Sequence, residues 1–141
     1  MKKLIIALSG LCLASQALGA DPAATRSKIE ANLQSNVRDA AEVARDANRK
    51  PGEVLEFFGL EDDMKVLEIS PASGYWSKFV GPTLCENGGE LVVSVGVSDS
   101  YKSDVMSLDG MDCVTSINND ITPIKRSIWV IKLNKELMLP A

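Results

Sequence analysis

The stretch "VLEISPASGYWSKFVGP", Val66 to Pro82, contains the signal that decides the fold. It opens on "VLEI", which with Lys65 forms the short apolar run "KVLEI", of the kind that forms a buried strand. "GYWSKFVGPTL" then predicts a helix, which we expect to bend or break at Gly81-Pro82. After the turn "ENGGE", the valine-rich "LVVSVGV" predicts a second buried strand. Strand, helix and strand within about thirty residues predict a βαβ unit with a parallel strand pair and a right-handed crossover, and hence an α/β fold.

A helical segment precedes this unit. Apolar residues recur at three- and four-residue steps from Arg26 to Lys50 and predict one helix. Alanine makes up the second half of this apolar stripe, so we expect the helix to lie on the surface. Pro51 suits the first turn of a second helix, and Gly59 suits the residue after its end. We expect residues 21–25, "DPAAT", to be a flexible start.

The sequence after Ser98 is less regular. "YKSDVMSL" predicts a short helix and "CVTSI" a short strand. "SIWVIKL" predicts a stronger strand that ends near Leu133 and places Trp129 in the core. Together with the βαβ unit, these segments predict three or four strands.

The first twenty residues predict an export signal that is removed from the mature protein. Lys2 and Lys3 form its charged start, "LIIALSGLCL" is its apolar run, and "ALGA" offers small residues for cleavage after Gly19 or Ala20. This apolar run is shorter than the ~18 residues that a membrane-spanning helix needs. We therefore expect no membrane span and a mature protein exported to the periplasm.

The charge balance excludes several classes of function. The chain has 15 basic and 19 acidic residues, a formal charge of −4, and losing Lys2 and Lys3 with the signal makes it −6. Nucleic-acid binding rests on clustered Lys and Arg, so we expect no nucleic-acid partner. The chain contains no histidine. This excludes the Ser-His and Cys-His arrangements of many hydrolases.

Two cysteines, Cys85 and Cys113, remain after the signal is removed. We rank their alternatives as unpaired packing residues first, a disulfide second and a catalytic role last. Two separated cysteines in a chain without histidine do not make a zinc site, and we predict no metal site.

The residues "VLEISPASGYWSKFVGPTLCENGGELVVSV" resemble the first motif of class I S-adenosylmethionine-dependent methyltransferases. The closer resemblance is to a group of exported, predicted methyltransferases. In that group a helical leader precedes the strand, a glycine loop follows the strand, and an aromatic pair begins the next helix. Here Arg38 to Leu60 match the leader, Val66 to Leu84 match the strand, loop and helix, and Tyr75-Trp76 match the aromatic pair. The resemblance covers about residues 38–97.

The resemblance implies a site for S-adenosylmethionine in the turn after the first strand. Glu68 would hold the loop or the methionine amino group, and Gly74 would let the cofactor approach the backbone. An acid at the end of the second strand would bond the ribose hydroxyls, and that position falls near Val95. Methyl transfer is an in-line attack on a sulfonium methyl, which positioning can catalyse without a dedicated base. The candidate cofactor residues are Glu68, Ser70, Ala72, Gly74 and Asp99, the last being the carboxylate nearest to Val95.

The chain also departs from the family pattern. Ala72 stands where the family usually has its central glycine, and the residues after Ser98 match nothing in the family. We therefore expect a partial Rossmann-like sheet in a truncated methyltransferase-like domain, residues 61–141, behind a helical leader, residues 21–60, and the signal, residues 1–20.

Two functions follow from these expectations. The first is an exported S-adenosylmethionine-dependent methyltransferase, whose acceptor and oligomeric state the sequence leaves open. The second is a non-catalytic relative that binds a small ligand or a partner. Glu68 is equally consistent with a buried acid that bonds its own loop. Tyr75 and Trp76 are more typical of packing residues than of ligand contacts.

Overall fold

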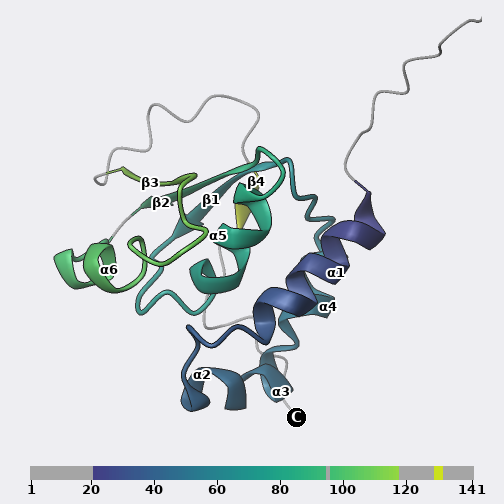
Figure 1. The fold of residues 1–141 in the computed structure, drawn as a ribbon, viewed down its shortest axis with the longest axis horizontal. Helices are drawn as coiled ribbons and strands as arrows, with labels where there is room; N and C mark the ends of the chain where they lie inside the picture. The colour runs from purple at the N-terminus through teal and green to yellow at the C-terminus, as the bar shows by residue number, and fades with distance from the viewer. Residues whose placement is uncertain (1–20, 95, 118–128, 132–141) are drawn as a thin grey trace, which may run out of the picture.

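The computed structural model describes residues 21–94, 96–117 and 129–131 (Figure 1). The predicted signal at residues 1–20, Val95 and the predicted core position of the Trp129 side chain lie outside this description.

A parallel sheet lies at the centre of the described fold (Figure 1). Its strands lie in the order β3-β2-β1-β4, and each neighbouring pair is parallel. In the register of β1 and β2, Glu68 lies opposite Val93. The predicted βαβ unit is confirmed, because helix α5 connects the parallel strands β1 and β2. The strands are β1 (Lys65–Ile69), β2 (Glu90–Ser94), β3 (Val114–Ile117) and β4 (Trp129–Ile131), and the connecting helix is α5 (Ser77–Cys85).

The apolar residues of the βαβ unit form the core. Val66 and Leu67 of β1 are buried, as are Leu91 and Val93 of β2. Phe79 of α5 is fully buried in the same cluster. The two strands therefore bury the apolar runs that predicted them, and the helix between them packs in the same core.

Helix α5 continues through the predicted interruption at Gly81-Pro82 and ends at Cys85. The helix is therefore not broken at Gly81-Pro82. Gly81 allows close packing here, because a Cβ atom on it would lie 2.5 Å from the Sδ atom of Met111. Buried neighbours such as Val80 and Leu84 hold the helix where Pro82 removes a backbone donor.

The first helix, α1 (Pro22–Leu33), begins at the segment that we predicted to be flexible. That prediction is wrong for a local reason. The side chain of Asp21 accepts a hydrogen bond from the backbone N–H of Ala23, and Pro22 occupies the first turn. Ile29 is buried where α1 packs against α5, so α1 contributes to the core.

The prediction of a single helix from Arg26 to Lys50 is also wrong, because this segment is divided among three helices. Helix α1 ends at Leu33, whose carbonyl oxygen accepts a hydrogen bond from the Arg38 guanidinium at 2.7 Å. Asp39 and Glu42 then form a capping box, which starts a new helix. The short helices after this break are α2 (Ala40–Ala44), α3 (Asp46–Arg49) and α4 (Pro51–Phe57).

The predicted helix start at Pro51 is confirmed in α4, and Gly59 follows its end with a φ of 67°. The predicted short helix and strand after Ser98 are confirmed as α6 (Asp99–Asp104) and β3. None of the helices among the described residues is long and apolar enough to cross a bilayer.

Cys85 and Cys113 form a disulfide with their Cα atoms 5.2 Å apart. The first-ranked expectation, unpaired packing residues, is therefore wrong. The fold brings the C-terminal end of α5 beside the turn that precedes β3, and that proximity has no signature in the sequence.

Reduction of this disulfide is expected to lower the free energy of unfolding by about 3–4 kcal/mol, because the bond closes a loop across a separation of 28 residues. Denaturant unfolding with and without reductant measures the loss. In the Cys85→Ser/Cys113→Ser variant, reductant should change nothing. Equal stability of the oxidised and reduced protein would contradict the pairing.

Candidate functional site

The turn after β1 has an unusual backbone. Ser70, Ala72 and Gly74 have φ angles of 59°, 52° and 82°, in the left-handed region. The N–H of Ser70 donates to the carbonyl of Ser94 at the end of β2, and the N–H of Gly74 donates to the carbonyl of Pro71, both at 2.8 Å. The loop is therefore a tight turn fixed at the carboxyl end of two neighbouring strands.

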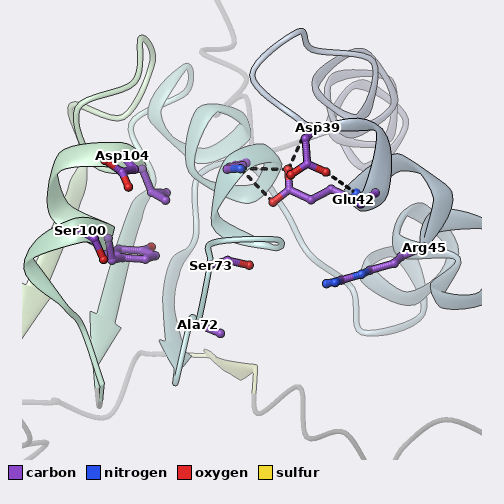
Figure 2. Close-up of a pocket in the computed structure, with 11 residues that line it drawn as sticks. Asp39, Glu42, Arg45, Ala72, Ser73, Ser100 and Asp104 are labelled. Carbon is purple, nitrogen blue, oxygen red and sulfur yellow. Dashed lines mark hydrogen bonds and ion pairs between the residues drawn. The ribbon is translucent and has the colours of Figure 1, made fainter.

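A cavity of about 320 Å³ lies beside this loop. In Figure 2, Ala72 and Ser73 lie between two walls. One wall comes from α2 and its flanking residues, and the other comes from α6. Ligands of open parallel sheets bind beyond the carboxyl ends of the strands, which is where this cavity lies. Its lining residues are Asp39, Ala41, Glu42, Arg45, Ala72, Ser73, Lys78, Ser100, Tyr101, Asp104 and Val105.

The structure separates the predicted cofactor residues. Among the five candidates, Ala72 lines the cavity. The Asp99 side chain is fully exposed, and one of its carboxylate oxygens lies 3.5 Å from the Nζ atom of Lys102. Asp104, at the other end of the same helix, lines the cavity instead. Ser70 contributes its backbone N–H to the turn.

Gly74 packs closely against other residues of the protein and does not line the cavity. A Cβ atom on Gly74 would lie 2.8 Å from Cγ2 of Val105 and 3.4 Å from Cε2 of Tyr101. The absent side chain thus makes room for α6 and the residue that follows it. The glycine that the sequence marked as a cofactor contact instead lets one wall of the cavity pack against the loop.

Glu68 is buried below the loop and belongs to a chain of hydroxyl groups. The Ser77 Oγ donates to a Glu68 carboxylate oxygen at 2.6 Å, and the Tyr101 hydroxyl donates to Ser77 Oγ at 2.7 Å. Burial raises the pKa of Glu68 to about 7, although the bond from Ser77 opposes this rise. Burial and the Glu68 charge raise the pKa of Tyr101 above its usual value. Glu68 is therefore linked to the cavity through Tyr101, which lines it.

A largely buried ion pair joins the α2 wall to α5. The Nζ of Lys78 donates to both carboxylate oxygens of Glu42, at 2.8 and 2.9 Å. The Asp39 carboxylate accepts from the backbone N–H of Glu42 at 2.8 Å and so fixes the start of α2. Sequence reasoning missed this pair, because the two residues lie 36 positions apart and neither stands out in its local pattern.

A second buried cluster supports α3. The Arg38 guanidinium donates to both carboxylate oxygens of Asp46 at 2.8 and 2.6 Å, and the Tyr75 hydroxyl donates to Asp46 at 2.5 Å. The Arg38 guanidinium also lies 5.3 Å from the centroids of the Tyr75 and Phe79 rings. Tyr75 is therefore a packing residue in this structure, with its hydroxyl used to fix Asp46.

Within residues 21–94, 96–117 and 129–131, no group of three or more Cys, Asp or Glu side chains is placed to hold a metal ion. Three of the charged cavity residues are instead engaged with one another or with the backbone, in the Lys78–Glu42 pair and the Asp39 cap.

No protein-family model, curated protein or solved structure matches the chain.

The Ala72→Gly substitution is expected to raise the free energy of unfolding by roughly 0.5–1 kcal/mol. Ala72 has a φ of 52°, a conformation that costs a residue with a Cβ atom about 1–2 kcal/mol, and part of that gain is offset by the greater freedom of glycine in the unfolded chain. Ser73→Gly is the control, since Ser73 is not in the left-handed region. Urea unfolding should show opposite signs for the two variants, and a loss of stability in both would contradict the strain at Ala72.

Proposed function

We propose that the chain is an exported, methyltransferase-like protein that binds S-adenosylmethionine in the cavity between α2 and α6. One observation carries the proposal. The cavity lies at the carboxyl end of β1 and is lined by Ala72 and Ser73, which belong to the loop that resembles the methyltransferase motif. The strand order β3-β2-β1-β4 supports it, because it is the order of the first four strands of a doubly wound Rossmann-type sheet.

The charges of the cavity suit this ligand. S-adenosylmethionine carries an ammonium, a carboxylate and a sulfonium group within a few bonds of one another. The cavity offers the guanidinium of Arg45 from one wall and the carboxylate of Asp104 from the other (Figure 2). Its volume of about 320 Å³ lies at the small end of the range of ligand sites, roughly 300–1,000 Å³.

Two features support the exported location. The Lys2-Lys3 start and the apolar run after it have the pattern of an export signal. The Cys85–Cys113 disulfide is a bond typical of oxidising compartments such as the bacterial periplasm.

The second candidate function is small-ligand binding without methyl transfer. It is favoured by the packing of Val105 against Gly74 and by the exposed position of Asp99, since neither predicted cofactor residue faces the cavity. Methyl transfer to an acceptor separates the two candidates, because binding is common to both.

Calorimetric titration of the protein without its export signal, residues 21–141, with S-adenosylmethionine and S-adenosylhomocysteine tests the proposal. We expect micromolar binding. Arg45→Ala and Asp104→Asn should each weaken it by roughly tenfold or more, which corresponds to about 1.4 kcal/mol.

Asp99→Asn is the matched control, since it makes the same change of charge on the same helix at an exposed side chain. It should leave the affinity unchanged. Absence of heat from a folded sample would overturn the proposal, and equal losses in Asp99→Asn and Asp104→Asn would place the ligand outside this cavity.

A further inference from the structure

The buried carboxyl group of Glu68 is connected to the α6 wall of the cavity by a line of two hydrogen bonds. The line runs from β1 through Ser77, the first residue of α5, to Tyr101 of α6. The residues Glu68, Ser77 and Tyr101 are 6%, 0% and 3% exposed, respectively. The line is therefore largely buried, and its two hydrogen bonds lie in surroundings that screen charge less than water does.

The surroundings of Glu68 provide little compensation for a negative charge. From α5 it is faced by Ser77 and from α6 by Tyr101 through Ser77. Its register partners in the two neighbouring strands are Val93 of β2 and Ile131 of β4, neither of which is titratable. Within the described part of the chain, no lysine or arginine forms an ion pair with Glu68. The nearby cation of the cavity, Lys78, is held by Glu42. The hydroxyl of Ser77 is therefore the one side-chain donor, among the described residues, that stabilises the charged carboxylate of Glu68.

The protonation state of Glu68 changes what Ser77 can do. A charged Glu68 accepts a hydrogen bond from the Ser77 hydroxyl, and this polarises Ser77 Oγ as an acceptor for the Tyr101 hydroxyl. A neutral Glu68 carries a proton of its own, which it can donate to Ser77 Oγ in competition with Tyr101. The hydrogen bond that anchors Tyr101 is consequently stronger when Glu68 is charged.

Tyr101 and Val105 connect this bond to the cavity. They lie four positions apart, so they share one face, and both line the cavity. Val105 is also the residue that packs against Gly74 of the loop. A displacement of Tyr101 therefore moves the wall opposite the α2 segment and alters its contact with the loop.

We propose that the charge on Glu68 sets the position of α6 against the loop, so that the shape of the cavity depends on pH. The change takes place near neutral pH, since burial raises the pKa of Glu68 to about 7. This device acts on the empty cavity and does not depend on which ligand the cavity takes.

Carbon-detected NMR of the protein without its export signal tests the device, with no ligand added. The Glu68 carboxyl carbon and the backbone amides of Ala72, Tyr101 and Val105 are followed between about pH 5.5 and 8.5. We expect all four signals to shift with one common midpoint. Glu68→Gln should remove the shift of the amides.

Tyr101→Phe separates a transmitted movement from a direct effect of charge. It removes the hydroxyl alone, so Glu68 should still titrate while the Val105 amide loses most of its shift. Asp99→Asn is the control on the same helix, at an exposed side chain, and should keep the full response. The proposal is overturned if the chemical shifts of the amides stay constant while Glu68 titrates. It is also overturned if the Val105 amide shifts in Tyr101→Phe as it does in the parent protein.

Discussion

Arg38→Ala is expected to lower the free energy of unfolding by roughly 3 kcal/mol, because it removes a fully buried cation from the Asp46 carboxylate, whose side chain is 24% exposed. The Arg38 side chain is fully buried and donates to both carboxylate oxygens of Asp46 and to the carbonyl of Leu33. Its loss leaves the Asp46 charge without this partner and removes the cation from the Tyr75 and Phe79 rings. Denaturant unfolding followed by tryptophan fluorescence measures the change.

Two further variants make the Arg38 experiment specific. Arg38→Lys keeps the charge but loses the planar double contact, and should fall between the parent protein and Arg38→Ala. Arg45→Ala removes an exposed guanidinium nearby and should change stability by no more than about 0.5 kcal/mol. Equal losses in Arg38→Ala and Arg45→Ala would show that the buried cluster is not a source of stability.

The stability of the protein is expected to fall as the pH rises through neutrality, because of Glu68. Burial raises its pKa from 4.5 to about 7, so the folded protein binds this proton more tightly than the unfolded chain does. The contribution is fully present below about pH 4.5 and is lost as the pH rises through about 7. A shift of this size corresponds to roughly 3 kcal/mol between the two limits.

Glu68→Gln should flatten this dependence, because glutamine keeps an acceptor for Ser77 and cannot ionise. Urea unfolding between about pH 5 and pH 8 measures the slope. Glu53→Gln is the control: its side chain is exposed, and the slope should be unchanged. Parallel stability curves for the parent protein and Glu68→Gln would show that the buried carboxyl group has no linkage to folding in this range.

The two predictions also bear on the cavity. Arg38 and Asp46 hold the short helix α3 beside Tyr75, and α3 follows the α2 wall directly. Glu68 acts on the opposite wall through Ser77 and Tyr101. A loss of ligand binding in Arg38→Ala would therefore need a check of folding, whereas the effect of Glu68 on the cavity is followed by NMR in the folded protein.

Local patterns in the sequence determined the central unit. The apolar run around Val66 predicted β1, the valine-rich run predicted β2, and the helix between them forms within the segment "GYWSKFVGPTL" that predicted it. The sequence also predicted the end of α4 at Gly59, because a residue without a Cβ atom adopts the left-handed conformation at little cost. These features could be predicted from the sequence, since each depends on residues that are close in the chain.

Tertiary structure decided the rest. The break after Leu33 depends on Arg38 turning back to a helix end, and the disulfide depends on α5 meeting the turn before β3. The cavity joins residues that are far apart in the sequence, as in the Glu42–Lys78 pair. Gly74 was predicted to admit a ligand, but the fold placed Val105 against it. Periodicity records which face of an element is buried, whereas only the packed fold decides what that face meets.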